Sequence, residues 1–235
     1  MQSGKQVCVV AGVGPGIGAS YARRFAKEGY AVALLARSAA FPAQLGASLP
    51  GARAFACDVG DEASVANAFA AIRRELGEPE VLLYNAGSGV FSGIEETTAA
   101  QMEAAWRVNA FGAFLCAKQA IPAMKQAGHG AIVLTGATAS RKGGARAAAF
   151  ASAKGAQRLL AESMARALWP AGIHVALIVV DGVVDLPRTR ERLKDKPDSF
   201  FVQPDAVAET ALRLVQQQRS AWSFEVEARP FAEQW

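Results

Sequence analysis

Residues 6–18, QVCVVAGVGPGIG, decide the fold, because a short apolar run leads directly into a cluster of glycines. The run at 6–11 is rich in valine, which predicts a buried strand. After the glycines, apolar residues recur at helical spacing over 19–28. The sequence therefore predicts a strand, a glycine loop and a helix in immediate succession.

The rest of the chain repeats this alternation. Further strands are expected at 31–36, 53–57, 80–84, 131–135, 173–180 and 222–229. Further helices are expected at 38–49, 65–76, 98–127, 147–169 and from 204 onward, with an irregular segment at 182–203. Apolar strands alternating with helices are typical of a parallel sheet covered on both faces. We predict an α/β fold, a doubly wound parallel β-sheet in three α/β/α layers, formed by one domain over 1–235.

Composition narrows the class of protein. Of the 235 residues, 51% are apolar and 20% charged, which is typical of a globular chain. The net charge of +4 is not concentrated in a basic run, so no nucleic-acid partner is expected. No stretch is apolar for long enough to span a membrane, and the N-terminus lacks the apolar core of a signal peptide. We expect a cytoplasmic protein with three free cysteines and no metal site.

The glycine cluster is suited to binding phosphate. Gly12 ends the first strand, whereas Gly16 and Gly18 open the helix. A side chain at these positions would keep a pyrophosphate away from the backbone amides. The N-terminus of the helix also favours negative charge. A strand, glycine loop and helix in this order therefore indicate a dinucleotide site.

The spacing Gly12-x3-Gly16-x-Gly18 resembles the short-chain dehydrogenase/reductase family, in which this segment reads TGxxxGxG. Ala11 stands in the place of the usual threonine. The resemblance implies a Rossmann fold that binds NAD(P), with Gly12, Gly16, Ile17 and Gly18 against the cofactor. It covers residues 7 to about 215.

The end of the second strand indicates which nicotinamide cofactor binds. NAD-specific sites place an acidic residue there to hold the ribose hydroxyls. Here the sequence is Ala36-Arg37-Ser38, and the arginine suits the 2′-phosphate of NADP. We therefore expect NADP(H) to be preferred, with NAD(H) possible. Asp58 and Val59 match the family's Asp-Val at the adenine.

Three further segments match the family in part. Asn85, Ala86 and Gly87 resemble its NNAG, which lines the cofactor. Asn109 lies on an expected buried stripe with Met102 and Trp106, and the resemblance implies that it holds a water linked to the active-site lysine. After the sixth strand, Asp181-Gly182 replaces Pro-Gly and Leu186 replaces a threonine, so the nicotinamide contact is expected at the backbone of Val184.

The catalytic pair of the family, YxxxK, is incomplete. This chain has Phe150 and Lys154, and Ala137 stands where the family has its serine, thirteen residues before the tyrosine. In the family the tyrosine hydroxyl protonates the new alkoxide and the serine holds the carbonyl oxygen. Phenylalanine has no proton to give. Lys154 and Asn109 are the catalytic residues that remain.

Two functions stay open at this point. The first is an NADP(H)-dependent oxidoreductase acting on a carbonyl or alcohol substrate, with the proton supplied by water, the substrate, Thr138, Ser140 or Ser152. The alternative is a catalytically inactive NADP(H)-binding protein, such as a redox sensor or an inactive subunit. Family members assemble through the helices after the fourth and fifth strands, so a homodimer or homotetramer is expected.

Overall fold

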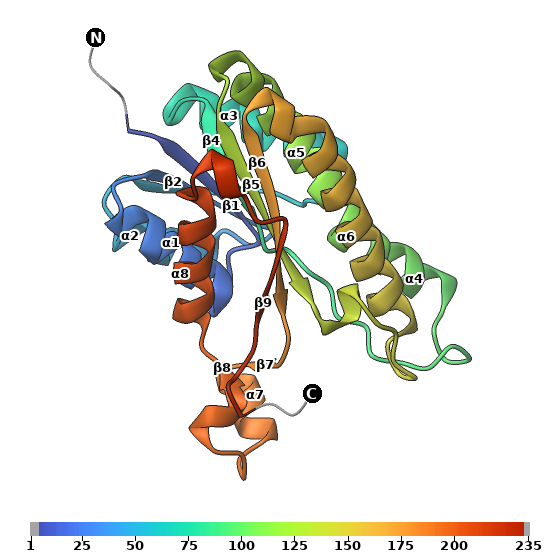
Figure 1. The fold of residues 1–235 in the computed structure, drawn as a ribbon. Coiled ribbons are helices and arrows are strands. Elements are labelled where there is room, and N and C mark those ends of the chain that lie inside the picture. Colours follow the sequence, from blue (N-terminus) through green and yellow to red (C-terminus); the bar gives the residue numbers. More distant parts are fainter. Residues whose placement is uncertain (1–4, 233–235) are drawn as a thin grey trace.

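The computed structural model describes residues 5–232 and has a twisted seven-stranded parallel sheet at its centre (Figure 1). The strand order is β3-β2-β1-β4-β5-β6-β9, and every printed pairing is parallel. The strands are β1 Val7–Ala11, β2 Ala31–Ala36, β3 Ala52–Ala56, β4 Pro79–Tyr84, β5 Gly130–Ala137, β6 Ile173–Val180 and β9 Glu225–Ala228. The predicted doubly wound α/β fold is confirmed.

Helices cover both faces of the sheet. One face carries α1 Ile17–Lys27, α2 Ala40–Ala47 and α8 Pro204–Val215. The other carries α3 Glu62–Glu75, α5 Gly112–Ala127 and α6 Ala148–Leu168, with α4 Ala99–Trp106 packed against α6. Within residues 5–232, no helix has both the length and the hydropathy needed to cross a bilayer.

The continuous apolar strands follow from this double cover. In β1, Val7 and Val9 belong to the core on the α3, α5 and α6 side, whereas Cys8 and Val10 belong to the core on the other side. Both sets are almost fully buried. Since successive side chains of a strand point to opposite faces, a sheet buried on both faces needs apolar residues at every position.

The long helix expected over 98–127 is interrupted. A π-helical turn at Arg107–Phe111 separates α4 from α5. The extra residue in this turn shifts the helical phase, so the expected buried stripe does not continue straight through it. The prediction that Trp106 belongs to a buried stripe is wrong: its side chain is 45% exposed, whereas Asn109 is fully buried.

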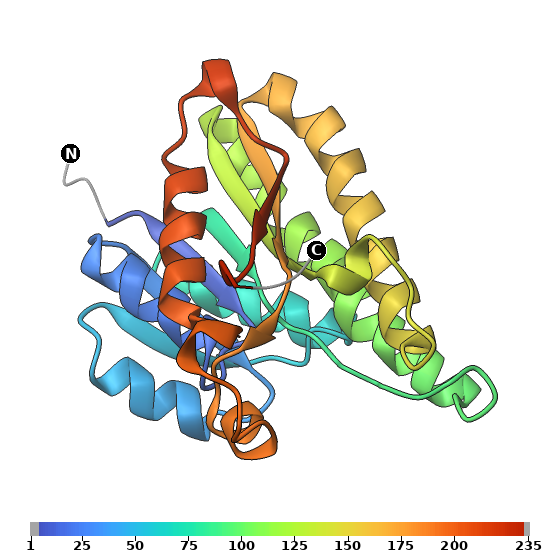
Figure 2. The same ribbon diagram turned by 60° about the horizontal axis from the view of Figure 1, so that its bottom comes forward.

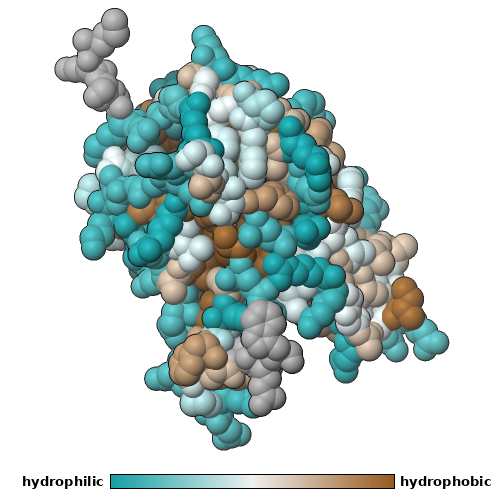
Figure 3. Space-filling view, in the orientation of Figure 1, coloured by the Kyte–Doolittle hydropathy of each residue, from teal (hydrophilic) through white to brown (hydrophobic). Residues whose placement is uncertain are grey.

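The segment expected to be irregular, 182–203, contains short regular elements. Strand β7, Val183–Val184, pairs with β8, Phe201–Val202, and helix α7, Pro187–Arg192, lies between them. Figures 1 and 2 show this segment projecting beyond the carboxyl ends of the sheet strands. A second projection carries α4 and the loop before it, and Figure 3 shows hydrophobic surface at its outer end.

Candidate cofactor and catalytic site

The glycine loop lies at the carboxyl end of β1, and three of its glycines have no room for a side chain. Gly12 has a φ of +99°, and a Cβ there would overlap the backbone of Ala86. A Cβ on Gly18 would overlap the carbonyl oxygen of Gly12, and one on Gly16 would overlap the side chain of Leu186. Helix α1 begins at Ile17, immediately after this turn. The loop therefore brings exposed backbone and a helix N-terminus to one place.

The segment Asn85–Gly87, directly after β4, is tied to the glycine loop. The Asn85 side-chain amide donates to the carbonyl oxygen of Gly12 at 2.8 Å. The backbone N–H groups of Asn85 and Ala86 both donate to Ala11 O, also at 2.8 Å. The ends of the neighbouring strands β1 and β4 are therefore held by three hydrogen bonds.

Arg37, Asp58 and Val59 follow the carboxyl ends of the next two strands. Arg37 comes directly after β2 and is exposed, so its guanidinium is accessible to a ligand. Asp58, after β3, is exposed and accepts a hydrogen bond from Gly60 N at 2.9 Å. Val59 is buried. The three residues lie at the same edge of the sheet as the glycine loop.

Lys154 is buried on α6, with 5% of its surface exposed. Its Nζ donates to the carbonyl oxygen of Thr135 at 2.8 Å and to Oε1 of Gln157 at 3.1 Å. Burial disfavours the ammonium form and lowers the pKa of Lys154 to about 7. The ordinary pKa of a lysine is 10.5, so burial moves the change of charge of Lys154 to near neutral pH.

Asn109, in the π-turn, faces the same place as Lys154. Its Nδ2 donates to Ser88 O at 3.0 Å and to Ala105 O at 2.9 Å. Its Oδ1 is buried and has no hydrogen-bond partner among residues 5–232. A Cβ built on Gly87 would lie 3.3 Å from this Oδ1 and 3.8 Å from Lys154 Nζ. The structure thus places both the unpartnered Asn109 Oδ1 and the Lys154 amine close to Gly87.

The hydroxyl groups considered as proton donors are engaged elsewhere. The hydroxyl of Thr138 donates to the Asp181 carboxylate, and Ser140 Oγ accepts from Ala137 N at 3.1 Å. Ser152 donates to Met102 Sδ at 3.2 Å and to a backbone carbonyl of its own helix. The hydroxyl protons of Thr138 and Ser152 are therefore engaged, whereas Ser140 is engaged as an acceptor.

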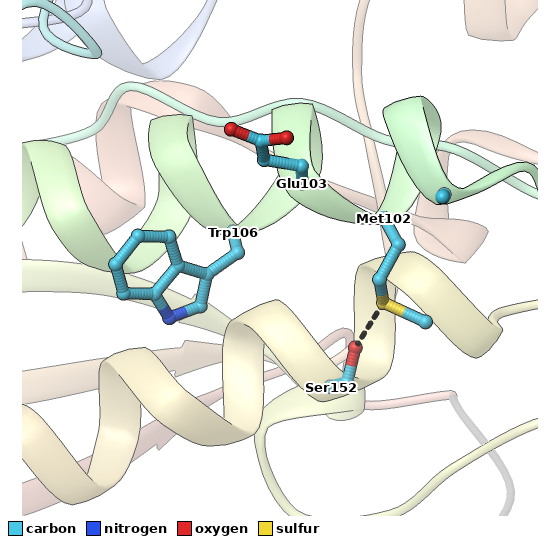
Figure 4. Close-up of a pocket in the computed structure, with 5 residues that line it drawn as sticks. Met102, Glu103, Trp106 and Ser152 are labelled. Carbon is cyan, nitrogen blue, oxygen red and sulfur yellow. Dashed lines mark hydrogen bonds between the residues drawn. The ribbon is translucent and has the colours of Figure 1, made fainter.

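Ser152 lines a hollow between α4 and α6 (Figure 4). The hollow has a volume of about 470 Å³ and is lined by Ala99, Met102, Glu103, Trp106 and Ser152. Its lining is mostly apolar. Ser152 is exposed here, whereas Lys154 on the same helix is buried.

Phe150 lies one turn before Lys154, and its ring centroid is 5.2 Å from that of Phe91. Ala137 ends β5 and carries no polar side-chain atom. Val184 is in β7, and its carbonyl oxygen accepts from the Thr189 hydroxyl at 2.6 Å. Phe150 and Ala137 thus bring no hydroxyl group to the site.

Sequence reasoning missed one residue, Gln157. It is fully buried on α6, and its amide contacts both Lys154 and the backbone of Asn109. Its position three residues after Lys154 was the available signal, because residues i and i+3 of a helix lie on the same side.

The fold and the site together define a class of protein. A doubly wound sheet binds nucleotides at the carboxyl ends of its strands where the strand order reverses, which is the position of β1 and its glycine loop. Residues 6–197 match the family model described as short chain dehydrogenase. The chain belongs to the short-chain dehydrogenase/reductase family, whose members are typically NAD(P)-dependent oxidoreductases.

Two solved structures and one curated relative, all named as dehydrogenases or oxidoreductases, are similar to this chain. A short-chain dehydrogenase from Rhodopseudomonas palustris is 35% identical, with a TM-score of 0.83 over 96% of this chain and 99% of that one. A metagenomic short-chain oxidoreductase in complex with NADP is 27% identical, with a TM-score of 0.82 over 98% and 99%. The "Inactive 2-(S)-hydroxypropyl-CoM dehydrogenase 2" of Xanthobacter autotrophicus is 32% identical over 83% of this chain and 90% of that protein.

Proposed function

We propose that the protein is an NADP(H)-dependent oxidoreductase for a carbonyl or alcohol substrate, with a proton donor other than a tyrosine. The observation that carries the proposal is the buried Lys154 beside the unpartnered Oδ1 of Asn109. Burying an amine and leaving an amide oxygen without a donor both cost free energy. A ligand with hydroxyl groups would form hydrogen bonds with both Lys154 Nζ and Asn109 Oδ1 and so offset these costs, which is a physical reason for placing the two groups here.

The residues present fit NADP(H). A Cβ at Gly12, Gly16 or Gly18 would overlap neighbouring atoms, so the loop leaves its backbone open to a ligand there. Arg37 offers an accessible guanidinium at the end of β2. When bound, the nicotinamide supplies or accepts the hydride. The residues that would hold the cofactor are Gly12, Gly16, Ile17, Gly18, Arg37, Asp58, Val59, Asn85, Ala86, Gly87, Lys154 and Val184.

Lys154 would orient the ligand and hold a proton near it. Two of its N–H positions point at carbonyl-type oxygens, which only accept hydrogen bonds. The third position is an N–H donor in the ammonium form and a lone pair in the neutral amine. With a pKa of about 7, both forms are populated near neutral pH, so the lysine can either donate to or accept from a hydroxyl group.

We infer that Phe150 occupies the position of the family's catalytic tyrosine and Ala137 that of its serine. The support is Lys154, which follows Phe150 by one turn on the expected helix. A positioned acid typically contributes about 10²–10⁴-fold to a rate. Because the hydroxyls of Thr138 and Ser152 already donate to other groups, the proton would come from water, the substrate or Ser140, whose hydroxyl only accepts from Ala137 N.

The alternative is a catalytically inactive NADP(H)-binding protein. The specific observation in its favour is the absence of a hydroxyl at both Ala137 and Phe150. One relative of similar length also carries the word inactive in its name. Under this alternative the cofactor would bind as it does in the enzyme, but no hydride would leave it.

Calorimetric titration with NADPH and NADH is the first test. We expect NADPH to bind more tightly. Arg37→Asp should lower NADPH affinity by about ten- to hundredfold, the worth of a charge-assisted hydrogen bond, with little effect on NADH. Failure of both cofactors to bind the folded protein would refute the proposed site.

Hydride transfer separates the enzyme from the alternative. NADPH oxidation is followed with a panel of aldehydes and ketones, using wild type and Lys154→Ala. If the protein is an enzyme, we expect wild type to turn over substrate faster than a cofactor-only blank, and Lys154→Ala to abolish this turnover. Bound NADPH with no turnover of any substrate favours the inactive protein.

We also propose a homodimer or homotetramer that uses the α4–α5 surface. Trp106 stacks on Phe111 at 5.3 Å, and Phe111 stacks on Phe114 at 6.1 Å. Trp106 and Phe114 are exposed, and exposed aromatic clusters mark interaction surfaces. Light scattering should show that Trp106→Glu dissociates the assembly, whereas Arg23→Glu on the opposite face does not.

A further inference from the structure

Gln157 is a fully buried side chain whose two polar ends are both occupied. Its Oε1 accepts from Lys154 Nζ at 3.1 Å, and its Nε2 donates to the carbonyl oxygen of Asn109 at 2.9 Å. A buried amide without partners would be destabilising, whereas an aliphatic residue would satisfy this part of the core without any partner. The amide therefore connects two groups that the proposed function places against the ligand.

The partner on the other side is the π-turn. Asn109 lies within Arg107–Phe111, where the regular helical hydrogen bonding of α4 and α5 changes. Such turns are frequent at functional sites and let side chains bond to helix carbonyls. Here the Gln157 side-chain amide donates to the carbonyl oxygen of Asn109. The Asn109 side-chain amide in turn donates to the carbonyl oxygens of Ser88 and Ala105. The π-turn and Lys154 are thereby held at a fixed separation.

We propose that Gln157 is a positioning residue: its amide fixes Lys154 Nζ between Thr135 and the π-turn and, as a hydrogen-bond acceptor, stabilises the charged form of this lysine. The role of Lys154 as a ligand-binding group rests on the proposed function. The hydrogen bonds of Gln157 to Lys154 and Asn109, and their effect on the charge of the lysine, do not depend on the proposed function.

The charge of Lys154 depends on its burial and on the two oxygens that accept its hydrogen bonds. Burial is the cause that lowers its pKa, and it favours the neutral amine. The oxygens of Thr135 and Gln157 oppose burial, because an acceptor stabilises an ammonium more than an amine. We therefore expect that removing the Gln157 oxygen lowers the pKa of Lys154 further.

Several titratable groups on the neighbouring elements are neutral or paired. Tyr21, whose hydroxyl is hydrogen-bonded to Thr135 Oγ1, has a raised pKa and stays protonated. Glu103 of α4 pairs with Arg107 at 2.9 Å. On α6, Arg158 pairs with Glu225 of β9 at 2.5 Å, and Glu162 pairs with Arg166 at 2.8 Å. After the short helical turn Thr138–Ser140, Arg141 pairs with Glu225 at 2.9 Å.

The test follows the lysine directly. Protein labelled with ¹³C at lysine Cε is titrated by NMR in the absence of cofactor, and the Lys154 signal is assigned as the one missing in Lys154→Met. Gln157→Met removes the acceptor at similar volume, and Gln157→Glu replaces it with a carboxylate. Gln126→Met, an exposed substitution on α5, is the matched control.

We expect the Lys154 midpoint to fall by about one unit or more in Gln157→Met, because the charged form loses a hydrogen bond. In Gln157→Glu it should rise by about one to three units, as for a lysine beside an opposite charge. Gln126→Met should match wild type. A Lys154 midpoint that is unchanged in either folded Gln157 variant would overturn the proposal.

A second readout keeps this inference separate from the proposed function. If NADPH binds, the pH dependence of its affinity should move in the same direction as the NMR midpoint in each variant. If the Lys154 midpoint shifts in the variants but NADPH does not bind, the effect of Gln157 on Lys154 is supported and only the cofactor site is refuted. Unchanged midpoints with normal NADPH binding would refute only the role of Gln157.

Discussion

Replacing Lys154 by methionine should change how the stability of the protein depends on pH. The side chain is buried, and its folded-state pKa is about 7 against 10.5 for the free group. Between these values the unfolded chain binds more protons than the folded one. The free energy of unfolding of the wild type therefore rises with pH through this window.

The magnitude follows from the gap between the two pKa values. At about 1.4 kcal/mol per unit, burying the ammonium costs about 5 kcal/mol below pH 7. At pH 9 about 2 kcal/mol of this cost remains. Between pH 6 and pH 9, the stability of the wild type should therefore gain about 3 kcal/mol that Lys154→Met does not gain.

The substitution also has an effect that does not depend on pH. It leaves the carbonyl oxygen of Thr135 and Oε1 of Gln157 without their donor, at a cost of about 1–3 kcal/mol each. This cost lowers the unfolding free energy of the variant equally at every pH. It cancels when the wild-type minus variant difference at pH 6 is compared with that at pH 9.

The assay is urea unfolding at pH 6, 7, 8 and 9 for wild type, Lys154→Met and the exposed control Lys125→Met. Burial also raises the pKa of Tyr21, Tyr84 and the cysteine thiols, but these groups are the same in all three proteins. The control should follow the wild type. If the difference between wild type and Lys154→Met is the same at pH 6 and pH 9, the lysine does not titrate as a buried group.

Three further outcomes are expected. Gly12→Ala should abolish NADPH binding in calorimetry or prevent folding, because its Cβ has no space, whereas Gly14→Ala should bind normally because nothing lies within 4 Å of its Cβ. Ala137→Ser combined with Phe150→Tyr should raise carbonyl reduction by about 10²-fold or more over wild type, and no gain in a cofactor-bound variant would show that the pocket differs elsewhere. Asp61→Ala should lower the unfolding free energy by about 1 kcal/mol in urea, because the carboxylate caps α3 at Ser64 N; an unchanged midpoint would show that the cap contributes nothing.

The sheet was predictable because both of its faces are buried. The central strands are mostly apolar, and the glycines of the loop are required by close backbone approach at Gly12 and Gly18. Both signals are local in the sequence. They were therefore sufficient to predict a doubly wound parallel sheet, whereas the order of its strands was not predicted.

The π-turn and Gln157 could not be predicted, because their causes are not local. A helical repeat through Met102 and Asn109 indicates one straight helix, and a single inserted residue leaves no compositional trace. A glutamine in a helix usually lies at the surface. Its partner Asn109 is 48 positions away in the sequence, so only the folded chain reveals the contact. The two-residue strands β7 and β8 are too short to show any periodicity.

The hydrogen bonds that join Asn85 and Ala86 to the glycine loop have a consequence for binding thermodynamics. A loop that is disordered before it binds must lose conformational entropy on association, which weakens affinity. Here the loop after β1 and the segment after β4 are already ordered against each other when the chain folds. Association with a nucleotide should therefore show a small entropic penalty from the protein and little change in backbone order, and its rate should reflect diffusion and desolvation more than loop closure.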